Sequence, residues 1–116
     1  MKKFVVMYRV PVEVMETWKK NTSPEEMKAQ GKKLGADMGV WMEKHKASIV
    51  EMGHPLGKNT RVDMHGAKPM TNDLNYFQVV QAESADDVVA MFKDNPHVQT
   101  IPEAFLDIME APHMGL

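Results

Sequence analysis

Residues 23–46, SPEEMKAQGKKLGADMGVWMEKHK, predict one long amphipathic helix. Ser23 can accept a hydrogen bond from a backbone N–H of the first turn, Pro24 suits that turn, and Glu26 can bond back to the cap. Apolar and aromatic side chains recur at steps of three, four and seven residues along one face of the helix: Met27, Leu34, Met38, Trp41 and His45. We therefore expect one face of this helix to be buried and the other to face water.

Gly31, Gly35 and Gly39 lie four residues apart on the flank of that buried face. A glycine inside a helix costs roughly 0.5 to 1 kcal/mol relative to alanine, so a compensating contact is expected. Two interpretations stay open. Either the helix backbone packs closely on a sheet, or the missing side chains leave room for a ligand.

The rest of the chain predicts strands around this helix and a second one. We expect strands at residues 4–10, 47–52, 60–64, 75–82 and 105–110, a second helix from Ser84 to the Asn95-Pro96 stop, and a polar loop at residues 68–74. This order predicts the α+β class, as a ferredoxin-like βαββαβ sandwich in which an antiparallel sheet carries two helices on one face. The first and central strands are apolar on both faces, so the uncovered face needs a partner. We predict a homodimer packed sheet to sheet.

Composition limits the classes of function and location. The 116 residues form a single domain, 1–116, and the net charge of -2 with scattered lysines argues against a nucleic-acid partner. The long helix contains no long apolar run, because it carries the charged residues Lys32, Lys33 and Asp37, so we expect no membrane interaction. The chain has no cysteine, which rules out disulfides and thiolate chemistry and fits a cytoplasmic location.

Neither a metal nor a cofactor is expected. The five histidines include no pair at helical i, i+4 spacing and no His-x-His, and most of the twelve methionines fall at core positions of helices and strands. Motifs for nucleophilic catalysis or phosphate binding are missing as well, because neither a Ser-His-Asp order nor a glycine-rich loop is present.

Two histidines are the candidate catalytic bases, His97 and His45. An unperturbed histidine pKa near 6.5 suits proton exchange around neutrality. Each has a structural alternative. His97 follows Asn95-Pro96 and is equally suited to fixing a turn, whereas His45 continues the buried face of the long helix and fits a hydrogen-bonded core role.

The candidate ligand pocket consists of Tyr8, Arg9, Trp41 and His54. The two aromatic rings offer flat walls with a polar tip, and the guanidinium can bind an anionic group. His54 lies in a Gly-His-Pro loop, where functional residues are common. Ordinary core packing, a surface salt link and an inert loop histidine are the alternatives for these residues.

Three segments resemble the YCII-related family: ASIVEMGHPL at residues 47–56, YFQVVQAESADDVVAMFKDNPHV at 76–98 and FLDIMEA at 105–111. The resemblance implies the dimeric α+β barrel superfamily, which includes small-ring isomerases, dehydrochlorinases, cofactor-free monooxygenases, haem enzymes and ligand-sensing modules. Fold analogy does not choose among them. Certain members pair an acid–base histidine of the first helix with an aspartate, where this chain has Gly35-Ala36-Asp37. The Asp-Gly-Pro-Phe segment of many members is replaced here by residues 71–74, Thr-Asn-Asp-Leu.

Two functions follow from these observations. The first is a YCII-like protein that binds a small-molecule ligand and catalyses acid–base isomerisation or elimination on it. The alternative is a non-catalytic dimeric module for ligand binding or interaction. A histidine converging with a polar partner on a cavity favours catalysis, whereas a closed apolar core favours the module.

Overall fold

A four-stranded antiparallel sheet forms the centre of the computed structural model, which describes residues 1–113. Its strands are β1 (Lys2–Arg9), β2 (Ile49–Glu51), β5 (Leu74–Ala82) and β6 (Phe105–Glu110), in the order β2-β5-β1-β6. All three strand pairs are antiparallel. This is the strand order of a ferredoxin-like sheet, so the predicted α+β class with an antiparallel sheet is confirmed.

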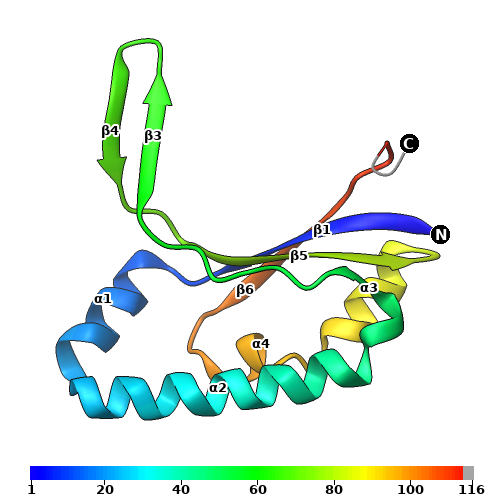
Figure 1. Ribbon diagram of the computed structural model, residues 1–116, viewed down its shortest axis with the longest axis horizontal. Coiled ribbons are helices and arrows are strands. Elements are labelled where there is room, and N and C mark those ends of the chain that lie inside the picture. Colours follow the sequence, from blue (N-terminus) through cyan, green and yellow to red (C-terminus); the bar gives the residue numbers. More distant parts are fainter. Residues whose placement is uncertain (114–116) are drawn as a thin grey trace.

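Four α-helices accompany the sheet within residues 1–113, where two were predicted to cover it. They are α1 (Val12–Asn21), α2 (Pro24–Lys44), α3 (Ala85–Phe92) and α4 (Pro96–Thr100). Figure 1 shows α2, α3 and α4 on one side of the sheet, with α1 beyond its end. The missed helix α4 has a clear cause: the Asn95 side chain accepts a hydrogen bond from the His97 backbone N–H, so the Asn-Pro pair that ends α3 also begins a helix.

The long helix α2 begins where the sequence predicts, because the Ser23 hydroxyl accepts a hydrogen bond from the Glu26 backbone N–H at 3.1 Å. The residues predicted to form its inner face do point toward the protein interior. Trp41 is buried, while Met27, Leu34 and Met38 are half-buried. The expectation that the three glycines of α2 pack closely on the sheet is wrong within this chain, since a Cβ added at any of them would meet nothing within 4 Å.

The hydrophobic core lies between the sheet and the helices. Alternate side chains of β1, namely Phe4, Val6 and Tyr8, point toward the helices and are at most 1% exposed. They pack with Val80 of β5, and with Val88, Phe92 and Trp41 from the helices. The alternation of β1 therefore places its other side chains on the opposite side of the sheet.

On that opposite side, here called the open face, no helix of residues 1–113 covers the sheet (Figure 1). Strand register places the ion-paired Arg9 and Asp107 there, together with six apolar side chains: Val5, Met7, Phe77, Val79, Phe105 and Met109. The first four are half-buried, and Phe105 and Met109 are 40% and 43% exposed. The radius of gyration, 15.7 Å, exceeds the value of about 13 Å expected for a compact domain of this length.

A two-stranded ribbon, here called the arm (residues 59–70), stands apart from the main sheet. It pairs β3 (Asn59–Asp63) with β4 (Gly66–Met70). The polar loop predicted at residues 68–74 is shorter than expected, because β4 runs to Met70 and β5 begins at Leu74, which leaves only residues 71–73 outside the strands. Pro69 is tolerated opposite Thr60 because each strand of a two-stranded ribbon has a free edge, where a missing N–H breaks no ladder bond. The arm rises on the side of the open face (Figure 1).

The strand predicted at residues 47–52 is shorter than expected, since Lys46–Ser48 form a 3₁₀ turn before β2. Gly53 then holds the chain against β5 in a backbone conformation with φ of +79°. A Cβ at this position would lie 1.6 Å from the Phe77 carbonyl oxygen, so only glycine fits. Among the helices described, none is long and apolar enough to cross a bilayer.

Candidate functional site

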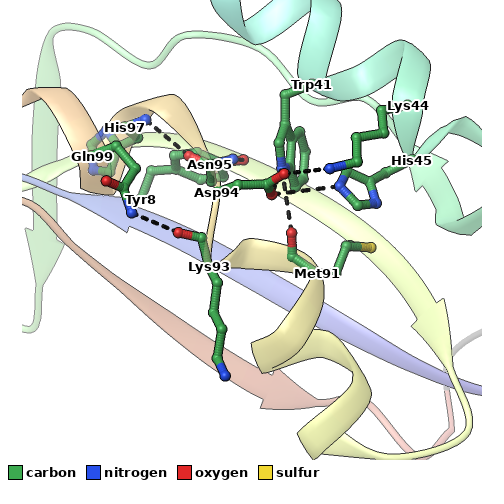
Figure 2. Close-up of polar contacts among 10 residues, drawn as sticks. All are labelled: Tyr8, Trp41, Lys44, His45, Met91, Lys93, Asp94, Asn95, His97 and Gln99. Carbon is green, nitrogen blue, oxygen red and sulfur yellow. Dashed lines mark hydrogen bonds and ion pairs between the residues drawn. The ribbon is translucent and has the colours of Figure 1, made fainter.

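Two consecutive residues between α3 and α4, Asp94 and Asn95, belong to two different clusters of polar side chains. Asp94 contacts residues of α2, whereas Asn95 reaches into the core toward Tyr8 of β1 (Figure 2). Four of the residues predicted for the site lie in these clusters. Tyr8 and His97 belong to one cluster, and Trp41 and His45 belong to the other.

The first group, here called the Tyr8 cluster, consists of Tyr8, Gln78, Asn95 and His97, each at most 5% exposed. The Tyr8 hydroxyl donates to Gln78 Oε1 and accepts from Asn95 Nδ2, the latter at 3.1 Å. His97 Nε2 lies 3.0 Å from the Arg9 carbonyl oxygen. A carbonyl can only accept, so this nitrogen carries the proton. Within residues 1–113, Gln78 Nε2 is the one polar atom of the cluster recorded as buried without a partner.

Burial keeps both titratable groups of the Tyr8 cluster neutral around pH 7. Loss of hydration raises the pKa of Tyr8, against the opposing hydrogen bond from Asn95. Loss of hydration also lowers the pKa of His97 below its usual 6.5, and this effect exceeds the opposing backbone contacts with Arg9 and Phe105. The cluster is therefore a closed, uncharged hydrogen-bond network between the sheet and α4.

The lowered pKa of His97 predicts that the protein loses stability on mild acidification. The unfolded chain takes up a proton at this histidine near pH 6.5, and the folded chain does so only at lower pH. The free energy of unfolding is therefore highest above about pH 6.5, and it decreases as the pH falls from there toward the pKa of His97 in the folded protein. Urea unfolding at about pH 7 and about pH 5 measures this loss.

The control for this prediction is His97→Gln, whose amide nitrogen can still donate to the Arg9 carbonyl but does not titrate. We expect the unfolding free energy of the variant to depend less on pH over the same range, so that the two stability curves converge on acidification. Parallel curves for the two proteins would contradict a lowered pKa at His97.

The second group, here called the His45 cluster, has four members (Figure 2). Trp41 and Lys44 belong to α2, His45 is the C-cap of that helix, and Asp94 follows α3. Asp94 Oδ1 accepts from Trp41 Nε1 at 3.1 Å, and Oδ2 accepts from Lys44 Nζ at 2.6 Å. The hydrogen bond from Lys44 is the main cause that lowers the pKa of Asp94, so the carboxylate is ionised at neutral pH. His45 Nε2 is 3.6 Å from Asp94 Oδ1, and it is buried without a hydrogen bond.

His45 also lines an open pocket of about 460 Å³ between the end of β5 and α3. The walls come from Ser48, from Gln81 and Ala82 at the end of β5, and from Ala90 and Met91 of α3. Glu83 and Asp87 add two carboxylates. His45 is the histidine that combines a position in this pocket with a carboxylate beside its ring.

Arg9 and His54 lie outside both clusters. The Arg9 guanidinium forms ion pairs with Asp73 at 2.6 Å and Asp107 at 2.7 Å. The side chain predicted to bind an anionic ligand is therefore already paired with two carboxylates of the protein. The hydrogen bond to Asp73 is the main cause that raises the pKa of Arg9. His54 is exposed in the segment between β2 and β3.

Sequence reasoning missed Gln78, Asn95 and Asp94 as site residues. Gln78 had a detectable signal, since it is a polar residue amid the apolar run of a central strand. Asn95 precedes Pro96 and has the signature of a helix cap. Asp94 had no such signal, because its role comes from contacts with α2, some fifty residues earlier. Across residues 1–113, no three acidic or histidine side chains lie close enough together to hold a metal ion.

Comparisons with known proteins give a likeness to solved structures only at the level of the fold. No family model and no curated protein matches the chain. Among solved structures, the fold is similar to 5-chloro-2-hydroxyhydroquinone dehydrochlorinase from Burkholderia phenoliruptrix AC1100, in complex with 2,5-dihydroxybenzoquinone. The two chains share 19% identity over 90% of each, with a TM-score of 0.49. At this level of similarity the match assigns no substrate and no reaction to the present chain.

Proposed function

We propose that this protein is a homodimeric, YCII-like protein that binds a small molecule beside His45 and uses this histidine for acid–base isomerisation or elimination. One observation carries the proposal: the His45 ring lines a pocket of about 460 Å³ and has an ionised carboxylate 3.6 Å from Nε2. A base positioned by a second polar group is the usual arrangement for proton transfer in enzymes. His97 is the weaker candidate, because its ring is buried and Nε2 is bound to a backbone carbonyl.

The chemistry assigned to His45 depends on Asp94. Nε2 lies 3.6 Å from Oδ1, just beyond hydrogen-bond distance, and such contacts often tighten when a ligand binds. Trp41 and Lys44 already hold the carboxylate in place. Asp94 then fixes the proton on Nε2, leaves Nδ1 free to remove a proton from the substrate, and stabilises the resulting imidazolium. Return of that proton to another substrate atom gives isomerisation, and loss of a leaving group gives elimination.

Proton abstraction can be tested without knowing the substrate. The protein is incubated in D₂O with a mixture of small metabolites, and deuterium incorporation into each compound is followed by mass spectrometry. We expect one compound or a related group to gain deuterium at a carbon position with wild-type protein. His45→Gln should reduce the rate by about 100-fold or more, because general acid–base catalysis typically contributes about 100-fold to 10,000-fold.

His65→Gln is the matched control, because His65 is exposed in the turn between β3 and β4. This variant should exchange at the wild-type rate. Undiminished exchange in His45→Gln would remove His45 as the base. Binding of a metabolite without deuterium exchange in any compound would leave the alternative function described next.

A non-catalytic dimeric binding module is the second candidate, and one observation favours it. Each oxygen of Asp94 already accepts a strong hydrogen bond, from Trp41 or from Lys44, so the carboxylate is satisfied without His45. In such a module the pocket would hold its ligand and the histidine would serve only as a polar contact.

The homodimer is proposed on the open face. Six apolar side chains gather there, and none of the helices described for this chain covers them. An apolar sheet face of this kind is stable when a second sheet packs on it, and a twofold axis offers the same surface on a second copy. The radius of gyration, above that of a compact domain, also supports a chain that completes its packing with a partner. We place the dimer in the cytoplasm, with which the cysteine-free composition agrees.

A further inference from the structure

We propose that the arm clasps a second copy of this chain, with its apolar face packed against the partner. This inference rests on the homodimer proposed above and assigns a surface beyond the open face itself. A sheet-to-sheet dimer does not require any such projection. The arm therefore needs its own explanation, and three observations supply one.

The first observation is that the arm is an amphipathic ribbon whose two faces are exposed within the part of the chain that the structure describes. Cross-strand register places Thr60 opposite Pro69 and Val62 opposite Ala67, so these residues share one, mainly apolar, face. Every residue from 60 to 69 is exposed, and Val62 is 76% exposed. An isolated two-stranded hairpin is marginally stable in water, so an ordered arm with an apolar face calls for a surface to pack on.

The second observation concerns direction. The arm rises from the sheet on the side of the open face and not on the side of the helices (Figure 1). A second copy packed on the open face would occupy the space beside the arm. Because a twofold axis makes the contact reciprocal, each arm would lie against the other copy and the dimer would close without a free surface that could add a third chain.

The third observation is charge. Arg61 and Lys68 are direct cross-strand neighbours, and like charges in this position repel. Neither forms an ion pair in the part of the chain that the structure describes. Asp63 lies on the same face of the ribbon as these two residues, because side chains alternate along a strand. The charged side chains of the arm therefore occupy the face that points away from the partner, and the apolar face is the one left to pack on the second copy.

The test is the dimer dissociation constant of Val62→Asp, measured by analytical ultracentrifugation. We expect an increase of 10-fold or more, because a carboxylate on the apolar face of the arm would lose water on clasping the partner. Val62 is 76% exposed, so the substitution leaves the folded monomer intact. Val40→Asp is the matched control, since Val40 is 72% exposed on α2 and lies away from the arm. It should change the constant less than two-fold.

A second measurement uses the cysteine-free chain, in which Val62→Cys introduces a single thiol. We expect maleimide labelling to slow at least 5-fold between dilute monomer and concentrated dimer, with no such change for Val40→Cys. Wild-type dimer with unaltered association in Val62→Asp and concentration-independent labelling at position 62 would overturn the clasp and leave the dimer standing. A wild-type protein that stays monomeric at high concentration would overturn the dimer and the clasp together.

Discussion

Replacing Met7 with aspartate is expected to convert the protein from a dimer into a monomer. Met7 lies in the middle of the open face, with Phe77 opposite it on β5 and Asp107 opposite it on β6. In a sheet-to-sheet dimer the new carboxylate would be buried beside another carboxylate, and the twofold axis would repeat this in both copies. A penalty of about 3 kcal/mol or more weakens association more than 100-fold. Sedimentation velocity across a dilution series measures the change.

Met7→Leu is the control for the open face, because it keeps an apolar side chain of similar volume and should leave the dimer intact. The monomeric Met7→Asp protein should remain folded, since the open face is already partly exposed to water in a single chain. If Met7→Asp associates as tightly as wild-type protein, the dimer does not form through this face.

Tyr8→Phe should lower the unfolding free energy by about 2 to 4 kcal/mol, although it removes a single oxygen. That oxygen donates to Gln78 and accepts from Asn95, and all three residues are at most 1% exposed. Its loss leaves two buried polar groups unpaired, each at a cost of roughly 1 to 3 kcal/mol, partly relieved by repacking. Equilibrium unfolding in urea gives the difference.

Tyr76→Phe is the matched substitution, because the Tyr76 hydroxyl donates to the Met52 carbonyl at 2.8 Å in a more exposed setting. Water can replace this partner, so the expected loss is about 1 kcal/mol or less. Equal losses in the two variants would show that the Tyr8 cluster is no more demanding than a surface hydrogen bond. The comparison thus tests whether the buried network stabilises the fold.

The contrast between α2 and the arm shows which parts of the fold can be predicted from sequence. The start of α2 follows from Ser23 and Glu26, and its inner face follows from the spacing of residues such as Met38 and Trp41. These are local signals within one element. In the arm, β3 follows from such a local pattern, since a strand is expected at residues 60–64. β4 does not, because Gly66 and Pro69 disfavour strands and β4 exists through its pairing with β3.

The candidate site divides in the same way. Histidine chemistry and the helical periodicity suggest His45 as a candidate from sequence alone. Its carboxylate partner could not be predicted, because Asp94 lies at the end of a different helix and its side chain reaches α2 only when α2 and α3 pack together. His97 is buried by a different contact, because its ring packs against Tyr8 of β1 and Nε2 donates to the Arg9 carbonyl.

The sequence by itself determined the α+β class, the long helix and a sheet that is apolar on both faces, because side-chain periodicity and capping act within single elements. Only the tertiary structure decided that Asp94 meets His45, that Tyr8 and His97 share a closed network, and that the arm stands on the open side of the sheet. These features depend on contacts between residues far apart in the chain, which local patterns of amino acids do not specify.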